Sequence, residues 1–172
     1  MNQQQEFSDV YLRGYPRLVA ELTLISGSRA AAEEAAQEAY SRAWGRWDTL
    51  GRYDDPQAWV RRVASNLLVS RWRRLRSALR MRPLVATLEA IDPPESDWLD
   101  LQPVLRSLPL VQRQALVLAA LEGFTADEIA VEMNVAPATV RSWLHRARVS
   151  ARSALETRAH ATAASKEMTD GD

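Results

Sequence analysis

Apolar side chains recur at steps of three and four residues along most of this chain, which is the spacing of one face of an amphipathic helix. The apolar positions of the first predicted helix are Phe7, Val10, Tyr11, Tyr15, Leu18, Leu22 and Ile25. No run of any length alternates apolar and polar residues, so β-sheets are not expected. The pattern predicts an all-α fold.

Local sequence signals predict where the helices of the first half begin and end. Gly27 ends the first helix, and Ser28 is a suitable N-cap for a second helix that runs to about Trp47. After a short loop, Asp55 and Pro56 provide a cap and a proline at the first helical position, which is a common start of a helix. The first half is therefore predicted to be a small helical bundle.

A proline-containing acidic stretch separates this bundle from a second group of helices. We predict a flexible linker over 83–98 and a second helical domain over 99–158. Within that domain Pro109 starts one helix and Gly123 ends it. The residues 125–128, Thr-Ala-Asp-Glu, then form a capping box at the start of the next helix.

Residues 125–148 have the pattern of a helix-turn-helix. Asn134 tolerates the left-handed turn between the two helices, and Pro137 starts the second helix. In this motif the second helix enters the major groove, where Arg141 would suit a guanine edge. A three-helix packing unit with a chance turn would give the same pattern. The residues predicted to face DNA are Pro137, Ala138, Thr139, Arg141, Ser142, His145, Arg146 and Arg148.

Composition excludes several classes of protein. The 172 residues include no cysteine, which excludes disulfide frameworks and thiolate metal sites. No stretch reaches the roughly 18 apolar residues of a membrane-spanning helix, and the first residues lack the pattern of a secretory signal. We expect a cytoplasmic protein with no membrane insertion, no metal and no cofactor.

The net charge of zero conceals a strong segregation of charge. Eight arginines and no acid lie over 56–88, five acids and no base lie over 89–105, and the last predicted helix is again basic. Two basic stretches around an acidic spacer predict a polyanionic partner. A pair of solvated helix faces would give a similar distribution.

Aromatic residues gather beside the first basic stretch. Interleaved aromatics and arginines suit single-stranded nucleic acid, because unstacked bases pack on flat rings and cations contact the backbone. Tryptophan at helical spacing is also typical of a hydrophobic core, and Trp47 and Trp59 lie on apolar stripes. Tyr53 in a loop and Trp72 among arginines fit a core less well. The clustered residues are Tyr40, Trp44, Trp47, Tyr53, Trp59 and Trp72.

Taken together, the two halves resemble the bacterial extracytoplasmic-function (ECF) RNA polymerase sigma factors, in an arginine-rich form similar to actinobacterial members. The resemblance covers about residues 7–157 and rests on the joint order of several segments. These segments are 32–40, 42–44, 55–66, 105–109, 112–113, 128–130, 139–142 and 146–148.

The resemblance implies a subunit that directs transcription initiation and is not an enzyme. Its domains would be a sigma region 2 domain over 1–82, the linker, a sigma region 4 helix-turn-helix over 99–158, and a disordered tail over 159–172. Region 2 would melt and read the minus-ten promoter element, and region 4 would read the minus-thirty-five element as duplex. The implied partners are core RNA polymerase, promoter DNA and an anti-sigma factor.

The resemblance also implies roles for single residues. The clamp helices of the largest polymerase subunit would bind Glu34, Gln37, Glu38 and Arg42, and the flap of the second-largest subunit would bind region 4. The residues implied at the minus-ten element are Gly51, Arg52, Tyr53, Asp54, Trp59, Arg62, Asn66, Arg71, Arg73 and Arg74. The exposed residues of the last helix given above would contact the minus-thirty-five element.

Three positions depart from the family pattern. Ser70 replaces an acid, Pro103 interrupts a helical stretch, and Ala136 replaces a serine-like cap before the recognition helix.

Three alternative functions are compatible with parts of the sequence. A stand-alone helix-turn-helix regulator with an N-terminal sensing or dimerisation domain leaves the arginine–tryptophan block unexplained. A helical enzyme with a carboxylate metal site would use Glu33, Glu34 and Glu38, but the Glu-x-x-His pattern of di-iron bundles is absent. A structural adaptor is the third alternative.

Overall fold

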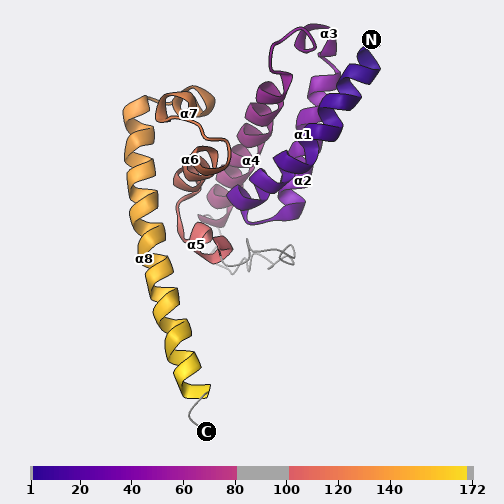
Figure 1. The fold of residues 1–172 in the computed structure, drawn as a ribbon. Helices are drawn as coiled ribbons and strands as arrows, with labels where there is room; N and C mark the ends of the chain where they lie inside the picture. Colours follow the sequence, from indigo (N-terminus) through magenta and orange to yellow (C-terminus); the bar gives the residue numbers. More distant parts are fainter. Residues whose placement is uncertain (1, 81–100, 170–172) are drawn as a thin grey trace. The chain divides into compact units, whose positions relative to one another are not determined.

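The computed structural model describes residues 2–80 and 101–169. Within these ranges all regular secondary structure is helical, which confirms the predicted all-α fold (Figure 1). The chain divides into two compact units between Pro93 and Pro94. The linker predicted over 83–98 lies outside the described residues.

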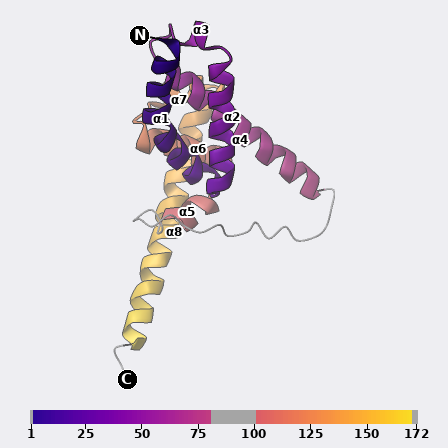
Figure 2. The same cartoon turned by 90° about the vertical axis from the view of Figure 1, so that its right-hand side faces the viewer.

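The first unit is a bundle of three long helices and one short one. Helix α1 packs beside α2, and α4 packs against both (Figures 1 and 2). The C-terminal part of α4 extends beyond the other helices of the unit, as Figure 2 shows. The helices are α1 (Gln3–Ser26), α2 (Arg29–Trp44), α3 (Trp47–Leu50) and α4 (Pro56–Arg80).

The local signals predicted two of these boundaries correctly. Gly27 adopts the left-handed conformation, with φ of 75°, and its N–H bonds the carbonyl of Thr23. The Ser28 hydroxyl accepts a hydrogen bond from the N–H of Ala31, so that it caps α2. At the start of α4, a carboxylate oxygen of Asp55 accepts from the N–H of Ala58 at 3.0 Å. Short-range capping therefore sets the ends of these helices.

The second helix ends earlier than predicted. It stops at Trp44, because the chain turns at Gly45 and Arg46 before α3 begins at Trp47. The N–H of Arg46 donates to the carbonyl oxygen of Ala43 in a tight four-residue turn. Trp47 is nevertheless 5% exposed, so it belongs to the core, as its place on the apolar stripe indicated.

Small residues let the helices of the first unit approach closely. The face of α2 that packs on its neighbours is made of buried alanines and Tyr40, and α1 contributes Leu22 and Ile25. The Tyr40 hydroxyl donates to Oε1 of Gln57 at 2.8 Å, and burial raises the pKa of Tyr40 to about 12. A Cβ atom on Gly14 would lie 2.5 Å from that hydroxyl, so a larger residue there would force the Tyr40–Gln57 contact to shift.

The second unit contains the predicted helix-turn-helix. The Thr125–Glu128 capping box is present at the start of α7, and Asn134 ends that helix with φ of 53°. Ile129 and Ala130 of α7 are buried with Val140 of α8 in the core of the unit. The helices are α5 (Leu101–Ser107), α6 (Leu110–Leu121), α7 (Ala126–Met133) and α8 (Pro137–Thr169).

One expectation for the second unit needs correction. A disordered tail was predicted over 159–172, but α8 continues to Thr169; the commonest residue of 159–169 is alanine, which has the highest helix propensity. Residues 170–172 lie outside the described residues. Pro103 lies within α5, and the residues before Leu101 lie outside the described residues.

Candidate DNA and polymerase interface

The residues predicted to read the minus-thirty-five element lie on the N-terminal half of α8. Val140, Leu144 and Ala147 point into the core of the second unit, which leaves the predicted positions on the other sides of the helix. Thr139 and Ser142 are half-buried. The exposed members of the set are Pro137, Ala138, Arg141, His145, Arg146 and Arg148. The helix thus presents a basic surface of the size and shape that enters a major groove.

One contact to this surface was not predicted from the sequence. Nη1 of Arg141 lies 3.2 Å from Oδ1 of Asp127, in the first turn of α7. The two residues are 14 positions apart, so no local pattern pairs them. The geometry of the helix-turn-helix brings them together.

Arg113 bonds the backbone of the second unit and has a structural role there. Its Nη2 donates to the carbonyl oxygens of Arg106, at 3.2 Å, and Leu108, at 3.0 Å, near the end of α5. Burial, and secondarily the charge of Arg106, lowers the pKa of Arg113 to about 10, so it remains protonated at neutral pH. Its side chain is 8% exposed. Arg113 therefore stabilises the turn between α5 and α6 and is not part of the basic surface.

In the first unit, the predicted minus-ten residues fall on two sides of α4. Trp59, Arg62 and Asn66 are spaced by three and four positions, so they share one side, and Arg73 follows two turns later. Arg62, Asn66 and Arg73 are exposed, and Trp59 is half-buried. This side of α4 therefore presents to solvent an amide, two guanidinium groups and part of an indole ring.

The other two arginines of α4 that were predicted at the minus-ten element, Arg71 and Arg74, lie against α2. Arg71 forms an ion pair with Glu34, and this interaction lowers the pKa of the Glu34 carboxyl. Arg74 lines a small pocket, of about 100 Å³, together with Glu38 and both members of that pair. The sequence grouped Arg71, Arg73 and Arg74 together, whereas the structure separates Arg73 from the other two.

The loop before α4 is fully accessible. All four predicted base-capturing residues, 51–54, are exposed, and the ring of Tyr53 is 51% exposed. The loop joins α3 directly to the capped start of α4. A ring held out in solvent at this point is available for stacking on a base.

The four residues predicted to bind the polymerase lie on the exposed side of α2. Glu34, Gln37 and Glu38 are exposed, and Nε of Arg42 lies 2.8 Å from Oε1 of Glu38. Trp44, at the end of the same helix, is 49% exposed and packs against Phe7 with ring centroids 5.0 Å apart. The sequence-based prediction did not include Trp44 in this surface.

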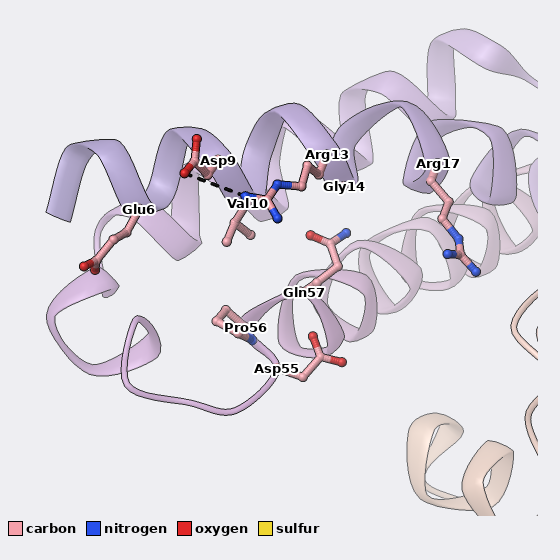
Figure 3. Close-up of a pocket in the computed structure, with 9 residues that line it drawn as sticks. All are labelled: Glu6, Asp9, Val10, Arg13, Gly14, Arg17, Asp55, Pro56 and Gln57. Atoms are coloured by element: carbon pink, nitrogen blue, oxygen red, sulfur yellow. Dashed lines mark ion pairs between the residues drawn. The ribbon is translucent and has the colours of Figure 1, made fainter. Parts of the chain in front are cut away.

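Two pockets of the first unit were also not predicted. One, of about 460 Å³, lies between α1 and the start of α4; its lining includes Asp9 and Arg13, which form an ion pair, and Asp55 and Gln57 (Figure 3). The second, of about 320 Å³, places Trp59 beside Arg42 and Arg46. Arg42 therefore lies close to a residue predicted for DNA as well as on the surface predicted for the polymerase.

Comparison with known proteins matches both units to one family. Residues 10–78 match the family model of Sigma-70 region 2, and residues 99–150 match that of Sigma-70, region 4. The ECF RNA polymerase sigma factor SigE of Mycolicibacterium smegmatis is 33% identical over 153 residues, covering 82% of this chain and 58% of that protein. The RNA polymerase sigma-E factor of Streptomyces avermitilis is 30% identical over 129 residues, covering 74% of this chain and 72% of that protein.

The chain belongs to the ECF sigma factors. A solved structure has the same fold: the sigma factor RpoE in complex with the anti-sigma factor NepR from Bartonella quintana superposes with a TM-score of 0.75. It is 24% identical in sequence, and the match covers 88% of this chain and 98% of that chain. The resemblance inferred from the sequence is confirmed.

The family matches include every site residue that was predicted from the sequence. Region 2 contains the exposed side of α2, the loop over 51–54 and both sides of α4. Region 4 contains the capping box of α7 and the basic surface of α8. The match to region 4 ends at residue 150, whereas α8 of this sigma factor continues to Thr169.

The described part of the sigma factor holds no helix long and apolar enough to cross a membrane. Nor do the described side chains form a cluster suited to a metal ion. Each carboxylate of the metal-site alternative is instead paired with an arginine. The pairs are Glu33 with Arg29, Glu34 with Arg71, and Glu38 with Arg42.

Proposed function

We propose that this sigma factor directs core RNA polymerase to specific promoters, with region 4 reading the minus-thirty-five element and region 2 melting and reading the minus-ten element. The observation that supports the proposal is that one chain holds both an exposed basic helix face, on the N-terminal half of α8, and a separate helical unit in which charged and polar residues of α2 are exposed. A stand-alone regulator needs only the first of these.

Region 4 would bind the upstream element as intact duplex. The N-terminal half of α8 enters the major groove, where Arg141 contacts a base edge and Arg146 and Arg148 contact phosphates. The phosphate contacts position the helix, and the base contact supplies discrimination. Binding therefore weakens as salt rises, because the arginines displace counterions from the DNA.

Region 2 would bind the downstream element as a single strand. Extruding a base costs a few kcal/mol in lost stacking and pairing. Stacking on an aromatic ring returns about 1–3 kcal/mol per base, and Tyr53 in the loop and Trp59 on α4 are placed to provide it. Asn66 and Arg62, on the same side of α4, would contact the base edge and the backbone. Melting then needs binding energy alone and no catalytic group.

The polymerase would be bound through both units. Glu34, Gln37, Glu38 and Arg42 of α2 would contact the clamp helices of its largest subunit, and region 4 would contact the flap of its second-largest subunit. These contacts would hold the two DNA-binding surfaces at the spacing of the two promoter elements. The sigma factor would act in the cytoplasm, without a cofactor or a metal.

An anti-sigma factor is a further proposed partner. The solved relative is a complex of a sigma factor with its anti-sigma factor. A regulator of this kind would compete with the polymerase for exposed surfaces such as that of α2.

The proposal is tested by binding to core polymerase that has been freed of other sigma factors. The full chain should co-elute with core in gel filtration, and Gln37→Ala with Glu38→Ala should weaken that complex. Gln5→Ala, which changes an exposed glutamine of α1 that is not among the residues proposed to bind the polymerase, is the matched control. Failure of the wild-type chain to bind core, together with binding to duplex DNA, would favour the stand-alone regulator.

A further inference from the structure

An aspartate in the first turn of α7 contacts the recognition helix. Oδ1 of Asp127 lies 3.2 Å from Nη1 of Arg141. Both side chains are largely exposed, at 75% and 60%, so the pair lies on the surface of the unit and not in its core. We propose that Asp127 is a positioning residue, which orients the guanidinium of Arg141 toward a guanine edge in the minus-thirty-five element. This inference rests on the proposed role of region 4.

The backbone that carries Asp127 is held firmly relative to α8. The Thr125 hydroxyl accepts from the N–H of Glu128, while Oε2 of Glu128 accepts from the N–H of Thr125 at 2.8 Å. Ile129, one turn later, is fully buried in the same core as Val140 of α8. The capping box before Asp127 and the buried Ile129 after it therefore hold the backbone of Asp127 in place beside Arg141.

Of the two acids in this turn, Asp127 is the one available to Arg141. The carboxylate of Glu128 is engaged by the backbone N–H and the hydroxyl of Thr125, which also lower the pKa of Glu128. The capping box thus uses one carboxylate of the first turn, and the other faces the recognition helix. The division of roles follows from the helical spacing of adjacent residues.

The pair has two physical consequences for reading DNA. Arginine is a long side chain with five N–H donors, and one contact to a carboxylate restricts its rotamers while leaving donors for a base. A carboxylate beside Arg141 also repels nearby phosphates, which disfavours a contact of that arginine with the DNA backbone. Asp127 would therefore favour the contact of Arg141 with a base in two ways. It restricts the rotamers of Arg141, and it disfavours a contact of Arg141 with a phosphate.

The test is a double-mutant cycle with the full chain and a library of short duplexes randomised over the upstream element. Comparison of wild type with Arg141→Ala identifies the base pair that Arg141 reads. In Asp127→Ala, the ratio of affinities for the preferred and the other base pairs at that position should fall about two- to fivefold. An exposed ion pair can supply an effect of this size. Discrimination at the other positions should be unchanged.

Two further variants separate positioning from a structural role. Asp127→Glu should restore most of the discrimination, because it keeps a carboxylate within reach of Arg141. In the Arg141→Ala background, Asp127→Ala should have no further effect on discrimination, since the two residues act together. Glu156→Gln removes one negative charge from an exposed position farther along α8 and should leave discrimination unchanged.

The outcomes are distinguishable. A uniform loss of affinity for every sequence in Asp127→Ala, or an effect of Asp127→Ala that persists without Arg141, overturns the inference and assigns Asp127 to helix stability. No change at all in Asp127→Ala also overturns it. A wild-type chain with no base preference would overturn the proposed role of region 4 and the inference with it.

Discussion

Glu34 on α2 and Arg71 on α4 form an ion pair, although the family resemblance implies that they bind different partners, the polymerase and the DNA. The pair joins two helices of region 2 at the seam where Glu38 and Arg74 also lie. Arg71 is thus turned away from the side of α4 that carries Asn66. Arg71 pairs with a carboxylate of α2, whereas Arg73 lies on the side of α4 that also carries Arg62 and Asn66.

The pairing predicts a measurable shift in the titration of Glu34. Arg71→Ala should raise the pKa of the Glu34 carboxyl toward its ordinary value, because the hydrogen bond and the charge that lower it are removed. Carboxyl chemical shifts followed by NMR across the acid range measure this pKa. Arg73→Ala, two positions away on α4, should leave the titration of Glu34 unchanged; an equal shift in both variants would contradict the pairing.

The capping box of α7 predicts how region 4 responds to substitution and to acid. Thr125→Ala should destabilise region 4 by about 1 kcal/mol, since the N–H of Glu128 loses its acceptor. Because Thr125 lowers the pKa of Glu128 in the folded state, its contribution is present at neutral pH and is lost as pH falls through the folded pKa. Thermal unfolding followed by circular dichroism at several pH values tests both statements. A Thr125→Ala variant as stable as wild type at neutral pH would show that the box contributes nothing.

Arg113 predicts a loss of stability without a change in base preference. Arg113→Ala removes the donor to two carbonyl oxygens at the end of α5 and should cost about 1–3 kcal/mol in the free energy of unfolding. Below its lowered melting temperature, the variant should still select the same upstream sequence as wild type. Chemical denaturation and duplex selection measure the two properties. An altered base preference with unchanged stability would instead place Arg113 at the DNA.

We expect the arginines on the basic surface of α8 to play two roles, one contacting a base and the others contacting phosphates. Arg141→Ala should cost about 1–3 kcal/mol at one base pair of the minus-thirty-five element and relax the preference there. Arg146→Ala should weaken binding almost uniformly across sequences and reduce the salt slope by about one. Fluorescence anisotropy on matched and mismatched duplexes over a range of salt separates these responses. Uniform weakening by Arg141→Ala would assign that residue to a phosphate.

The sequence predicted the elements of this fold well where the determining interactions are local. Gly27, Ser28 and the Thr125–Glu128 box act over three or four residues, so their roles are visible in the chain itself. The identity of the buried face was also predictable, because Val140 and Leu144 recur at helical spacing.

Contacts between helices were not predictable in the same way. Arg71 with Glu34, Arg141 with Asp127 and the pocket of Trp59 with Arg46 each depend on how two helices pack. A run of arginines looks uniform in sequence, whereas the packing of α4 on α2 gives its members different neighbours. The length of α8 was underestimated because polar and small residues were taken as disordered, although alanine strongly favours helix.

The most direct test of the central claim is transcription by sigma-free core polymerase with the purified full chain on fragments of the source genome. Mapping the 5′ ends of the transcripts should reveal discrete start sites that share two upstream elements, and these starts should disappear without the sigma factor. Asn66→Ala should reduce initiation at those sites while Arg141→Ala changes which upstream sequences are used. Transcripts that begin at random positions, with or without the chain, would contradict the account.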